Sequence, residues 1–394
     1  MPLDRGNSII QAADYSPTYS GNFIASLSAA ARQCRAHGYR TVWVLPAKAH
    51  AYPWFRSLVE DFGGSVYALP DRGTLAGDTM ALRRIAMREN AAIIHTHFSS
   101  SDISAWFTKV LCTLESRNVQ VFWHVHSAFT DISAMRRSKD FIKLGVLGRL
   151  CHVVPVSTAL GEAVAARGCP RDRIHVIDNG IDIQHATAKQ TSREEMRKAW
   201  AVPSGSLVML GFGWTPIRKG VDTMLEALAT LLREGRNLTL VLAGTEQLQK
   251  FIDDWPDRDC LARVRVIPPA EFVGDLFGAS DIFLSPSRAE GWCYGVAEAM
   301  ANEVPAIAGD IPPLNWARGA DGVYFCTAGD SEALAASIRQ VSDLSPVVRA
   351  ITGELAKNFV ACRYSVECWG SKIWDLYEQV LRPVQSSMLP ASSK

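Results

Sequence analysis

The chain of 394 residues is long enough for about two to three domains, and its composition of 48% hydrophobic and 21% charged residues is ordinary for a globular protein. Its 41 basic against 40 acidic side chains leave a formal net charge of +1, which argues against a nucleic-acid-binding protein with a broad basic face. The nine cysteines form no C-x-x-C pair, so neither a disulfide framework nor a zinc ribbon is expected, and scattered thiols fit a reducing compartment.

The chain starts Met-Pro-Leu-Asp-Arg-Gly-Asn, without a charged segment followed by an apolar stretch, so no signal peptide is expected. No apolar run approaches the roughly 18 residues that a membrane-spanning helix needs. We therefore expect a cytoplasmic protein that is soluble or at most peripheral to the inner face of the membrane.

The first half of the chain alternates short apolar segments with longer helical patterns, which is typical of βαβ units over a parallel sheet. The predicted helices include Phe23–His37 and Asp102–Ser116. The predicted strands are Arg40–Leu45, Ala91–Thr96, Val119–Val125, His152–Val156 and the start of Ile174–Asp182. The polar segment Gln184–Arg193 then interrupts the pattern and is the candidate linker.

The second half repeats the alternation, with a helix from Val221 and a closing helix over Ser365–Val380. Its predicted strands are Ser206–Phe212, Leu238–Ala243, Val264–Ile267, Ile282–Leu284 and Ala306–Ala308. We therefore predict an α/β protein of two doubly wound domains, residues 1–187 and 188–365, with a closing helix over 366–385 that packs back on the first. Such sheets bind ligands beyond the carboxyl ends of their strands, so two facing sheets would form a ligand-binding cleft.

Two carboxylates lie in the segment Ser285–Pro305 (SPSRAEGWCYGVAEAMANEVP). Glu290 falls in a short loop, and Glu298 lies in a helix expected from about Gly295. Gly291 and Gly295 let the backbone approach a ligand, and free amides at a helix start favour an anion by roughly 0.3–1 kcal/mol. Because one carboxylate can accept hydrogen bonds from two neighbouring hydroxyls, the segment fits a diphosphate with a sugar at each end. The alternative is a surface helix with ordinary acidic residues.

This segment resembles the signature of retaining family-4 glycosyltransferases of the GT-B fold: a strand, Pro-Ser, Glu-Gly, seven residues between two Glu, then a small-residue helix and Pro. The resemblance implies two facing Rossmann-like domains, the first for the acceptor and the second for a nucleotide diphosphate sugar. It implies that Glu290 contacts the donor sugar, in a catalytic role, and that Glu298 binds the ribose. The other donor-binding residues implied in this segment are Gly291, Trp292, Cys293, Tyr294 and Gly295.

A second match is the segment Gly211–Gly220 (GFGWTPIRKG). The family has a Gly-Arg pair after this strand and a Lys-Gly pair at the next helix, and both cations serve the diphosphate. Lys219 and Gly220 match, but Trp214 stands where the family has the Arg. Arg218 is the candidate to supply the second charge from another direction, and the alternative is that it is only a solvated loop charge.

The resemblance implies a retaining reaction, in which negative charge builds on the leaving diphosphate. One cation at about 4 Å stabilises that charge by on the order of 4 kcal/mol at an effective dielectric constant near 20. Lys219 is therefore predicted to be catalytic, with Arg218 assisting. No residue stands out as a covalent nucleophile, so we favour front-face attack, in which the acceptor hydroxyl passes its proton to the departing phosphate.

In the first half, Tyr15–Phe23 (YSPTYSGNF) resembles the first strand-to-helix loop of the family. Gly21 matches a glycine that approaches the donor phosphate, and Asn22 stands where a second glycine is usual. The family also has a histidine after a strand, near both sugars, and His126 matches it better than His124. We predict a catalytic role for His126 and acceptor-binding roles for Asn22 and His124. Since strand alternation puts both histidines on one face, one could serve only to orient the other.

Other readings stay open. The His-x-His pairs at 95–97 and 124–126 could instead indicate a metal-dependent hydrolase, but no convincing set of further ligands follows them. The Asp-x-Asp pair at 257–259 sits in a predicted loop, so no metal and no cofactor is expected. Further alternatives are another GT-B enzyme, such as a nucleotide-sugar epimerase or an inverting transferase, and a non-enzymatic two-domain binding protein.

The expected partners are a UDP- or GDP-sugar donor, as co-substrate, and a saccharide, lipid-linked or small-molecule acceptor. The resemblance places such a reaction in bacterial polysaccharide or glycoconjugate biosynthesis. The segment Met135–Leu150 (MRRSKDFIKLGVLGRL) combines five basic residues with apolar ones. It could rest on an anionic membrane as a basic, partly amphipathic helix, or it could pack its apolar side on the domain.

Overall fold

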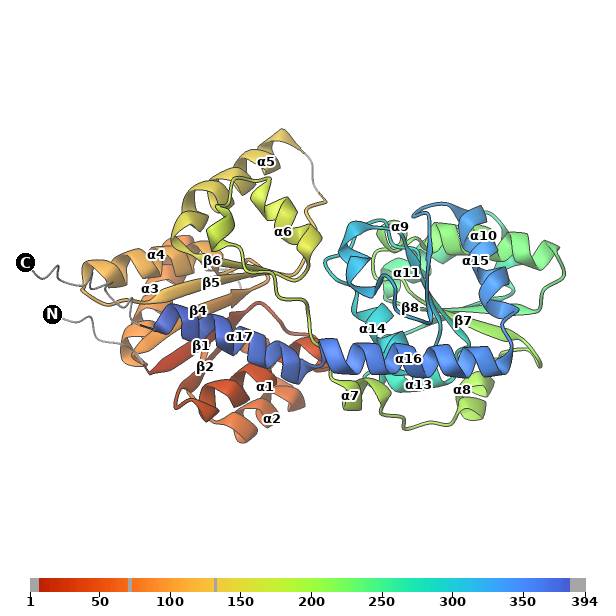
Figure 1. Cartoon of the computed structure of the whole chain (residues 1–394), viewed down its shortest axis with the longest axis horizontal. Helices are drawn as coiled ribbons and strands as arrows, with labels where there is room; N and C mark the ends of the chain where they lie inside the picture. The colour runs from red at the N-terminus through yellow and green to blue at the C-terminus, as the bar shows by residue number, and fades with distance from the viewer. Residues whose placement is uncertain (1–6, 70–72, 131–132, 383–394) are drawn as a thin grey trace, which may run out of the picture.

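The computed structural model describes residues 7–69, 73–130 and 133–382, which fold into two α/β domains lying side by side (Figure 1). The last three residues of the predicted closing helix, 383–385, lie outside the described residues. In the described residues the strands form two six-stranded parallel sheets, one in each domain. The predicted α/β fold class, with two doubly wound domains, is confirmed.

The first sheet has the strand order β3-β2-β1-β4-β5-β6 and carries helices on both faces (Figure 1). The strand order reverses direction between β1 and β4, and their carboxyl ends therefore open a crevice in which such sheets bind ligands. The strands are β1 (Ser8–Ala13), β2 (Arg40–Pro46), β3 (Val66–Leu69), β4 (Ala91–His97), β5 (Gln120–Val125) and β6 (His152–Pro155). The helical segments are α1 (Gly21–Ala36), η1 (Ala47–Ala51), α2 (Pro53–Phe62), α3 (Leu75–Arg88), α4 (Asp102–Leu114), α5 (Ala134–Phe141), η2 (Ile142–Val146), η3 (Leu147–Leu150), α6 (Thr158–Ala165) and η4 (Arg171–Arg173).

The second sheet has the order β12-β11-β10-β7-β8-β9, so the matching reversal lies between β7 and β10. Its strands are β7 (Leu207–Phe212), β8 (Leu238–Ala243), β9 (Val264–Ile267), β10 (Ile282–Ser285), β11 (Ala306–Gly309) and β12 (Val323–Cys326). The remaining helical segments are α7 (Ile183–Thr187), α8 (Arg193–Ala199), α9 (Pro216–Lys219), α10 (Val221–Arg233), α11 (Glu246–Asp253), α12 (Arg258–Leu261), α13 (Val273–Gly278), α14 (Tyr294–Ala301), η5 (Pro312–Ala317), α15 (Ser331–Ser342), α16 (Pro346–Tyr364) and α17 (Val366–Leu381).

The predicted strands correspond to β2 and β4 to β11, with one exception. The strand expected at the start of Ile174–Asp182 was wrong. Ile174 makes an isolated bridge to Val153, and the hydrogen bonds from His175 N–H to Val153 O and from Ile177 N–H to Pro155 O do not extend into a ladder. Part of the candidate linker is also helical. Asp182 accepts a hydrogen bond from the His185 backbone and so caps the short helix α7.

Two chain crossings join the domains, and they lie against each other. The Ile181 N–H donates to Tyr364 O at 2.7 Å, and the Val366 N–H donates to Ile181 O at 3.0 Å. The Ser365 side chain caps α17, which then runs along α1 of the first domain (Figure 1). The chain therefore returns to the first domain at its end. The predicted domain limits themselves stay a prediction.

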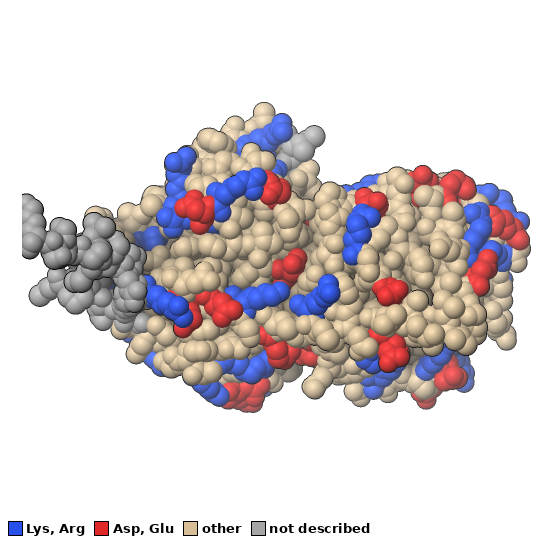
Figure 2. All heavy atoms as spheres, in the orientation of Figure 1, with Lys and Arg blue, Asp and Glu red and all other residues tan. Residues whose placement is uncertain are grey.

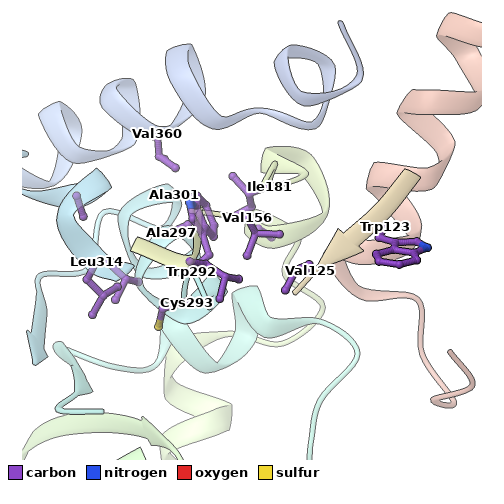
Figure 3. Packing of buried hydrophobic residues seen from close by; sticks show 14 of the residues in the cluster. Trp123, Val125, Val156, Ile181, Trp292, Cys293, Ala297, Ala301, Leu314 and Val360 are labelled. Atoms are coloured by element: carbon purple, nitrogen blue, oxygen red, sulfur yellow. The ribbon is translucent and has the colours of Figure 1, made fainter. Parts of the chain in front are cut away.

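The apolar core continues from one domain to the other beneath the cleft. Val125 and Val156 at the ends of first-domain strands lie near Trp292 and Cys293 of the second, with Ile181 of the crossing close by (Figure 3). Burying this shared surface stabilises the domains against each other. On the face seen in Figure 2, basic and acidic side chains are interspersed over both domains. Within the described residues, no helix combines the length and the apolar character that crossing a bilayer requires.

Candidate active site

A cavity of about 350 Å³ lies between the two sheets, beyond the carboxyl ends of the strands at which each strand order reverses. This is where two facing doubly wound sheets bind ligands, and the volume is within the usual range for small molecules. The cavity is lined by every predicted site residue except His124: Gly21, Asn22, His126, Arg218, Lys219, Glu290, Gly291, Trp292, Cys293, Tyr294, Gly295 and Glu298.

Two cations flank Glu290 on the second-domain wall. Lys219 Nζ lies 2.6 Å from Glu290 Oε1, and both side chains are largely buried, with exposed fractions of 12% and 7%. The Arg218 guanidinium lies 4.0 Å from Glu290 Oε2 and also donates to Ala289 O and to Thr215 Oγ1. Two cations against one carboxylate leave a local excess of positive charge, which suits an anionic ligand.

A glycine fixes the position of Lys219. Gly220 follows it with φ 72° and ψ 32°, in the left-handed region that costs glycine little. A Cβ at this position would lie 2.6 Å from Pro286 O, so no larger residue fits without moving the backbone. The Lys-Gly pair therefore holds the end of α9, which carries Lys219, against the segment that carries Glu290.

Glu298 has a different environment from Glu290. The Asn22 amide of the first domain donates to Glu298 Oε1 at 2.7 Å, and Asn22 Oδ1 accepts from the Asp182 N–H at 3.1 Å. Burial raises the pKa of Glu298 to about 7, although Asn22 and Lys219 act in the opposite direction. The hydrogen bond joins the two domains across the cavity. It places Asn22 beside the predicted ribose-binding carboxylate, and the acceptor-binding role of Asn22 stays a prediction.

The loop after Glu290 is shaped by close packing. A Cβ at Gly291 would lie 2.1 Å from His126 O, and one at Gly295 would lie 2.7 Å from the Phe283 ring. Cys293 has φ 77°, a conformation that non-glycine residues seldom adopt, and it directly precedes α14. This turn brings the start of α14 to the cavity wall. Both glycines thus have a packing role in addition to the predicted approach to a ligand.

Trp292 forms part of the cavity floor. Its ring is 1% exposed and stacks on Trp316 with ring centroids 4.3 Å apart. Figure 3 shows it among Ile181, Val156 and Ala297, at the junction of the two domains. The side chain therefore packs the core as well as lining the cavity.

The first-domain wall presents His126 between aromatic rings. The His126 ring stacks on Phe98 at 4.5 Å between centroids and meets Phe23 edge-on at 5.6 Å. His126 Nε2 lies 3.1 Å from His97 Nδ1, so His97, and not His124, is its hydrogen-bonding partner. His124 is completely buried and lies 3.1 Å from His95 instead. The acceptor-binding role predicted for His124 is therefore corrected, because its ring does not reach the cavity.

Three of these histidines lie close enough to be considered as metal ligands. His95, His97 and His124 are buried and offer nitrogens within 4.8 Å of one another. Each ring nevertheless makes a hydrogen bond to a neighbouring side chain, which competes with metal coordination. Asp257 of the Asp-x-Asp pair caps α12. The expectation of no metal stays a prediction.

Several residues that line the cavity were not assigned from the sequence. Some fall inside the recognised segments but not at the matched positions, and the others are single positions spread over strands, helices and loops. The unassigned residues are Tyr19, Phe23, Phe98, Ser127, Asn179, His185, Phe212, Trp214, Ala243, Ala270, Glu271, Val273 and Leu276. The Asn179-Gly180 pair, just before the candidate linker, is a turn signal that could have pointed to Asn179. In the sequence, Trp214 stands out only as a departure from the family pattern, because it occupies the position of the family Arg.

Comparison with known proteins agrees with this architecture. The family model described as Glycosyltransferase Family 4 matches residues 25–185, and the one described as Glycosyl transferases group 1 matches residues 192–359. The chain is 28% identical over 290 residues to the amylovoran biosynthesis glycosyltransferase AmsK of Erwinia amylovora, covering 68% of this chain and 67% of the relative. It is 26% identical to a D-inositol 3-phosphate glycosyltransferase of Xylanimonas cellulosilytica, covering 62% and 63%. The matches thus span about two thirds of these relatives.

Solved structures match over nearly the whole chain. A glycosyltransferase from Rickettsia africae superposes with a TM-score of 0.77 at 18% identity, covering 96% of this chain and 100% of that one. Anabaena Alr3699/HepE, solved in complex with UDP, superposes with a TM-score of 0.74 at 17% identity, covering 94% and 100%. At these identities the likeness defines the fold.

The two facing Rossmann-like domains, with a charged cavity between their strand ends, define a GT-B glycosyltransferase. The two family matches together cover both domains. The chain belongs to the family-4 glycosyltransferases.

Proposed function

We propose that the protein transfers a sugar from a nucleotide diphosphate sugar, a UDP- or GDP-sugar, to an acceptor hydroxyl with retention of the anomeric configuration. The observation that carries the proposal is the pair of cations, Lys219 and Arg218, flanking Glu290 on the cavity wall. A diphosphate can take the place of one carboxylate oxygen against these cations, and it brings the donor sugar beside Glu290. Glu298, on the same wall, is available for the ribose hydroxyls.

The chemistry follows from how charge develops. As the bond between the anomeric carbon and the diphosphate breaks, negative charge builds on the leaving oxygen, where Lys219 stabilises it. Positive charge develops on the sugar, beside the carboxylate of Glu290. The acceptor hydroxyl attacks from the face the diphosphate leaves and passes its proton to the departing phosphate. His126 faces the same space from the first domain.

The names of relatives support a role in polysaccharide or glycolipid biosynthesis. AmsK is named for amylovoran biosynthesis, and another relative, 24% identical over 303 residues, is an alpha-galactosylglucosyldiacylglycerol synthase of Streptococcus pneumoniae. Alr3699/HepE has been solved with UDP and glucose and with UDP-glucose. A saccharide or a glycolipid is accordingly the proposed acceptor class.

A single assay separates this function from its alternatives. The protein is incubated with radiolabelled UDP- and GDP-sugars and candidate acceptors, and free sugar, epimerised donor and transfer product are resolved. We expect a transfer product whose anomeric proton has the configuration of the donor. An epimerised donor without acceptor would indicate an epimerase, and an inverted anomer would indicate an inverting transferase. Either result would overturn the proposal.

We further propose that the segment Met135–Leu150 rests on an anionic membrane surface while a lipid-linked acceptor is used. The supporting observation is that most of its apolar side chains face solvent, so packing on the domain does not account for them. Basic side chains within reach of lipid phosphates would each add about 1 kcal/mol near the surface. The exposed apolar residues are Met135, Phe141, Ile142, Val146 and Leu150, at 48–70% exposed, and the neighbouring basic residues are Arg136, Arg137 and Lys139.

Vesicle sedimentation at low salt tests this contact. We expect the protein to sediment with anionic vesicles and to remain in solution with neutral ones. The double variant Ile142→Ser and Val146→Ser should release it. The matched control is Val347→Ser with Ile351→Ser, which alters an equally exposed apolar pair on α16 of the second domain. No sedimentation of the unaltered protein, or equal loss in both double variants, would refute the membrane contact.

A further inference from the structure

A connected group of polar side chains lies behind the His126 wall of the cavity. Gln11, in the middle of β1, is its centre: Gln11 Oε1 lies 3.0 Å from His97 Nε2, and Gln11 Nε2 donates to the Tyr377 hydroxyl at 3.1 Å. We call this group the Gln11 network. Its members come from β1, β4, the end of β5 and α17, and they are Gln11, His95, His97, His124, His126 and Tyr377.

The histidines of the Gln11 network are neutral at physiological pH. Burial lowers the pKa of His95 and of His126 to about 3, and it holds the pKa of His97 and His124 well below the ordinary range. A neutral imidazole has one N–H and one bare nitrogen. Each hydrogen bond in the network therefore has a donor end and an acceptor end. A ring that donates from one nitrogen must accept at the other, so the tautomer of one ring determines the tautomer of the next.

The direction can be followed from Gln11 to the cavity. Because the Gln11 amide nitrogen donates to Tyr377, its oxygen is the atom that faces His97, and His97 must carry its proton on Nε2. His97 Nδ1 is then bare and accepts from the Nε2–H of His126. The remaining nitrogen of His126, Nδ1, is consequently bare and has no hydrogen-bond partner among the described residues.

Tyr377 supports this direction from the C-terminal helix. Its hydroxyl accepts from Gln11, so its single proton is free to be donated to His95 Nδ1, with which it is in hydrogen-bond contact. His95 in turn donates to His124 Nδ1, and the chain ends at His124 Nε2, which is buried without a partner in the part of the chain the structure describes. Turning the Gln11 amide over would reverse the network and put a proton on His126 Nδ1.

We infer that Gln11 and Tyr377 are positioning residues that hold His126 with its proton on Nε2 and its bare Nδ1 toward the cavity, as a hydrogen-bond acceptor for a hydroxyl of the transferred sugar. This inference rests on the proposed function and adds a specificity element to it. A donor sugar with a hydroxyl at this point pairs with Nδ1, whereas a deoxy analogue leaves the nitrogen unpaired. The aromatic rings of Phe23 and Phe98 keep the imidazole in place.

The experiment combines a spectroscopic and a kinetic readout. Protein with 15N-labelled histidine rings is studied by NMR, the His126 signals being assigned by their loss in His126→Asn. Three variants are compared. Gln11→Met keeps the length of the side chain and removes its polar atoms. Gln11→Glu differs from Gln11→Met in having a carboxyl group, which presents an oxygen to His97 in its protonated and in its ionised form. Trp374→Phe alters the packing of α17 one turn before Tyr377, and Trp374 makes no hydrogen bond to the network among the described residues.

The inference expects His126 Nδ1 in the unprotonated range in the unaltered protein. Gln11→Met should give a mixed or reversed tautomer and lower kcat roughly tenfold, the worth of about one hydrogen bond, with nucleotide affinity unchanged. Gln11→Glu should restore both readouts, and Trp374→Phe should leave both unchanged.

A protonated Nδ1 in the unaltered protein, or an unchanged tautomer in Gln11→Met, would overturn the inference. Thermal melting of each variant verifies that it is folded. The tautomer measurement needs no substrate, so it tests the Gln11 network even if the transferase assay fails.

Discussion

The two walls of the cavity are built in different ways. The second-domain wall carries charge: Lys219 and Arg218 against Glu290, with Glu298 nearby. The first-domain wall presents a neutral histidine held by a buried hydrogen-bond network. The charged wall is suited to the proposed diphosphate, on which negative charge develops. The neutral wall is suited to sugar hydroxyls, which need oriented hydrogen-bond partners and not an opposite charge. On the proposed function, the second domain would therefore control the diphosphate and the first domain the sugar hydroxyls.

The two carboxylates of the charged wall differ as well. Glu290 is held in an ion pair with Lys219, whereas the pKa of Glu298 is raised to about 7 by burial and its partner is the neutral Asn22 amide. Glu290 therefore stays coupled to the cations. The raised pKa places the change of charge of Glu298 near physiological pH, so the proposed binding of ribose by Glu298 should depend on pH.

The largest expected effect comes from the charged wall. Lys219→Ala removes the cation nearest the developing charge and should lower kcat by roughly 100-fold or more. Steady-state transfer kinetics measure it. The control is Lys357→Ala, which breaks an exposed ion pair with Glu303 far from the cavity and should leave kcat unchanged. Activity of Lys219→Ala within threefold of the unaltered protein would remove Lys219 from its assigned role.

Glu298→Gln is expected to act on binding. The substitution keeps the size of the side chain but weakens charge-assisted hydrogen bonds to the ribose, so donor affinity should fall by roughly 1.5–3 kcal/mol. Calorimetric titration with the nucleotide diphosphate measures the loss, and Glu303→Gln on the exposed surface is the matched control. Equal affinity in Glu298→Gln and the unaltered protein would contradict the ribose assignment.

The raised pKa of Glu298, about 7 against an ordinary 4.5, makes a pH prediction. Ribose binding uses the ionised form, so donor affinity should rise as the pH rises through about 7 and level off above it. The stability of the free protein moves in the opposite direction. The contribution of Glu298 to the free energy of unfolding is fully present below the unfolded-state pKa and is lost as the pH rises through the folded-state pKa. Titrations and melts at several pH values test both trends, and Glu298→Gln should abolish both.

Arg218→Ala should have the smallest effect of these changes. Its side chain is 38% exposed, and its guanidinium lies farther from Glu290 than the Lys219 ammonium does. We therefore expect kcat to fall roughly fivefold, and Arg218→Lys to recover most of it. Steady-state kinetics of Arg218→Ala and Lys219→Ala, measured side by side, give the ratio of their losses in kcat. A loss as large as that of Lys219→Ala would mean that Arg218 fully replaces the family Arg absent at Trp214, and no loss would mean that it is only a loop charge.

The charged wall could be predicted from the sequence because its residues fall in two contiguous segments. The charged side chains, the expected start of a helix and the glycines that carried the prediction all lie within a few residues of Lys219 or Glu290. The neutral wall could not. Gln11 and Tyr377 are 366 positions apart, and only the return of α17 to the first domain brings them together. No local pattern in either segment marks such a contact.

The missed strands have similarly physical causes. The apolar run of β1 is interrupted by Gln11, whose polar side chain is satisfied only by the network. The strands β3 and β12 are short and lie at the sheet edges, where Val66, Tyr67 and the first three residues of β12 are only partly buried, so the apolar signal is weak.

The central claim is that the charged wall binds a nucleotide diphosphate sugar through Glu298, while Lys219 acts on the charge that develops as the diphosphate leaves. Calorimetric titration of UDP-, GDP- and other nucleotide sugars into the unaltered protein, Lys219→Ala and Glu298→Gln tests it most directly. We expect saturable binding of at least one nucleotide sugar by the unaltered protein, weakened binding by Glu298→Gln and retained binding by Lys219→Ala. Absence of binding for the whole panel, or unchanged binding in Glu298→Gln, would contradict it.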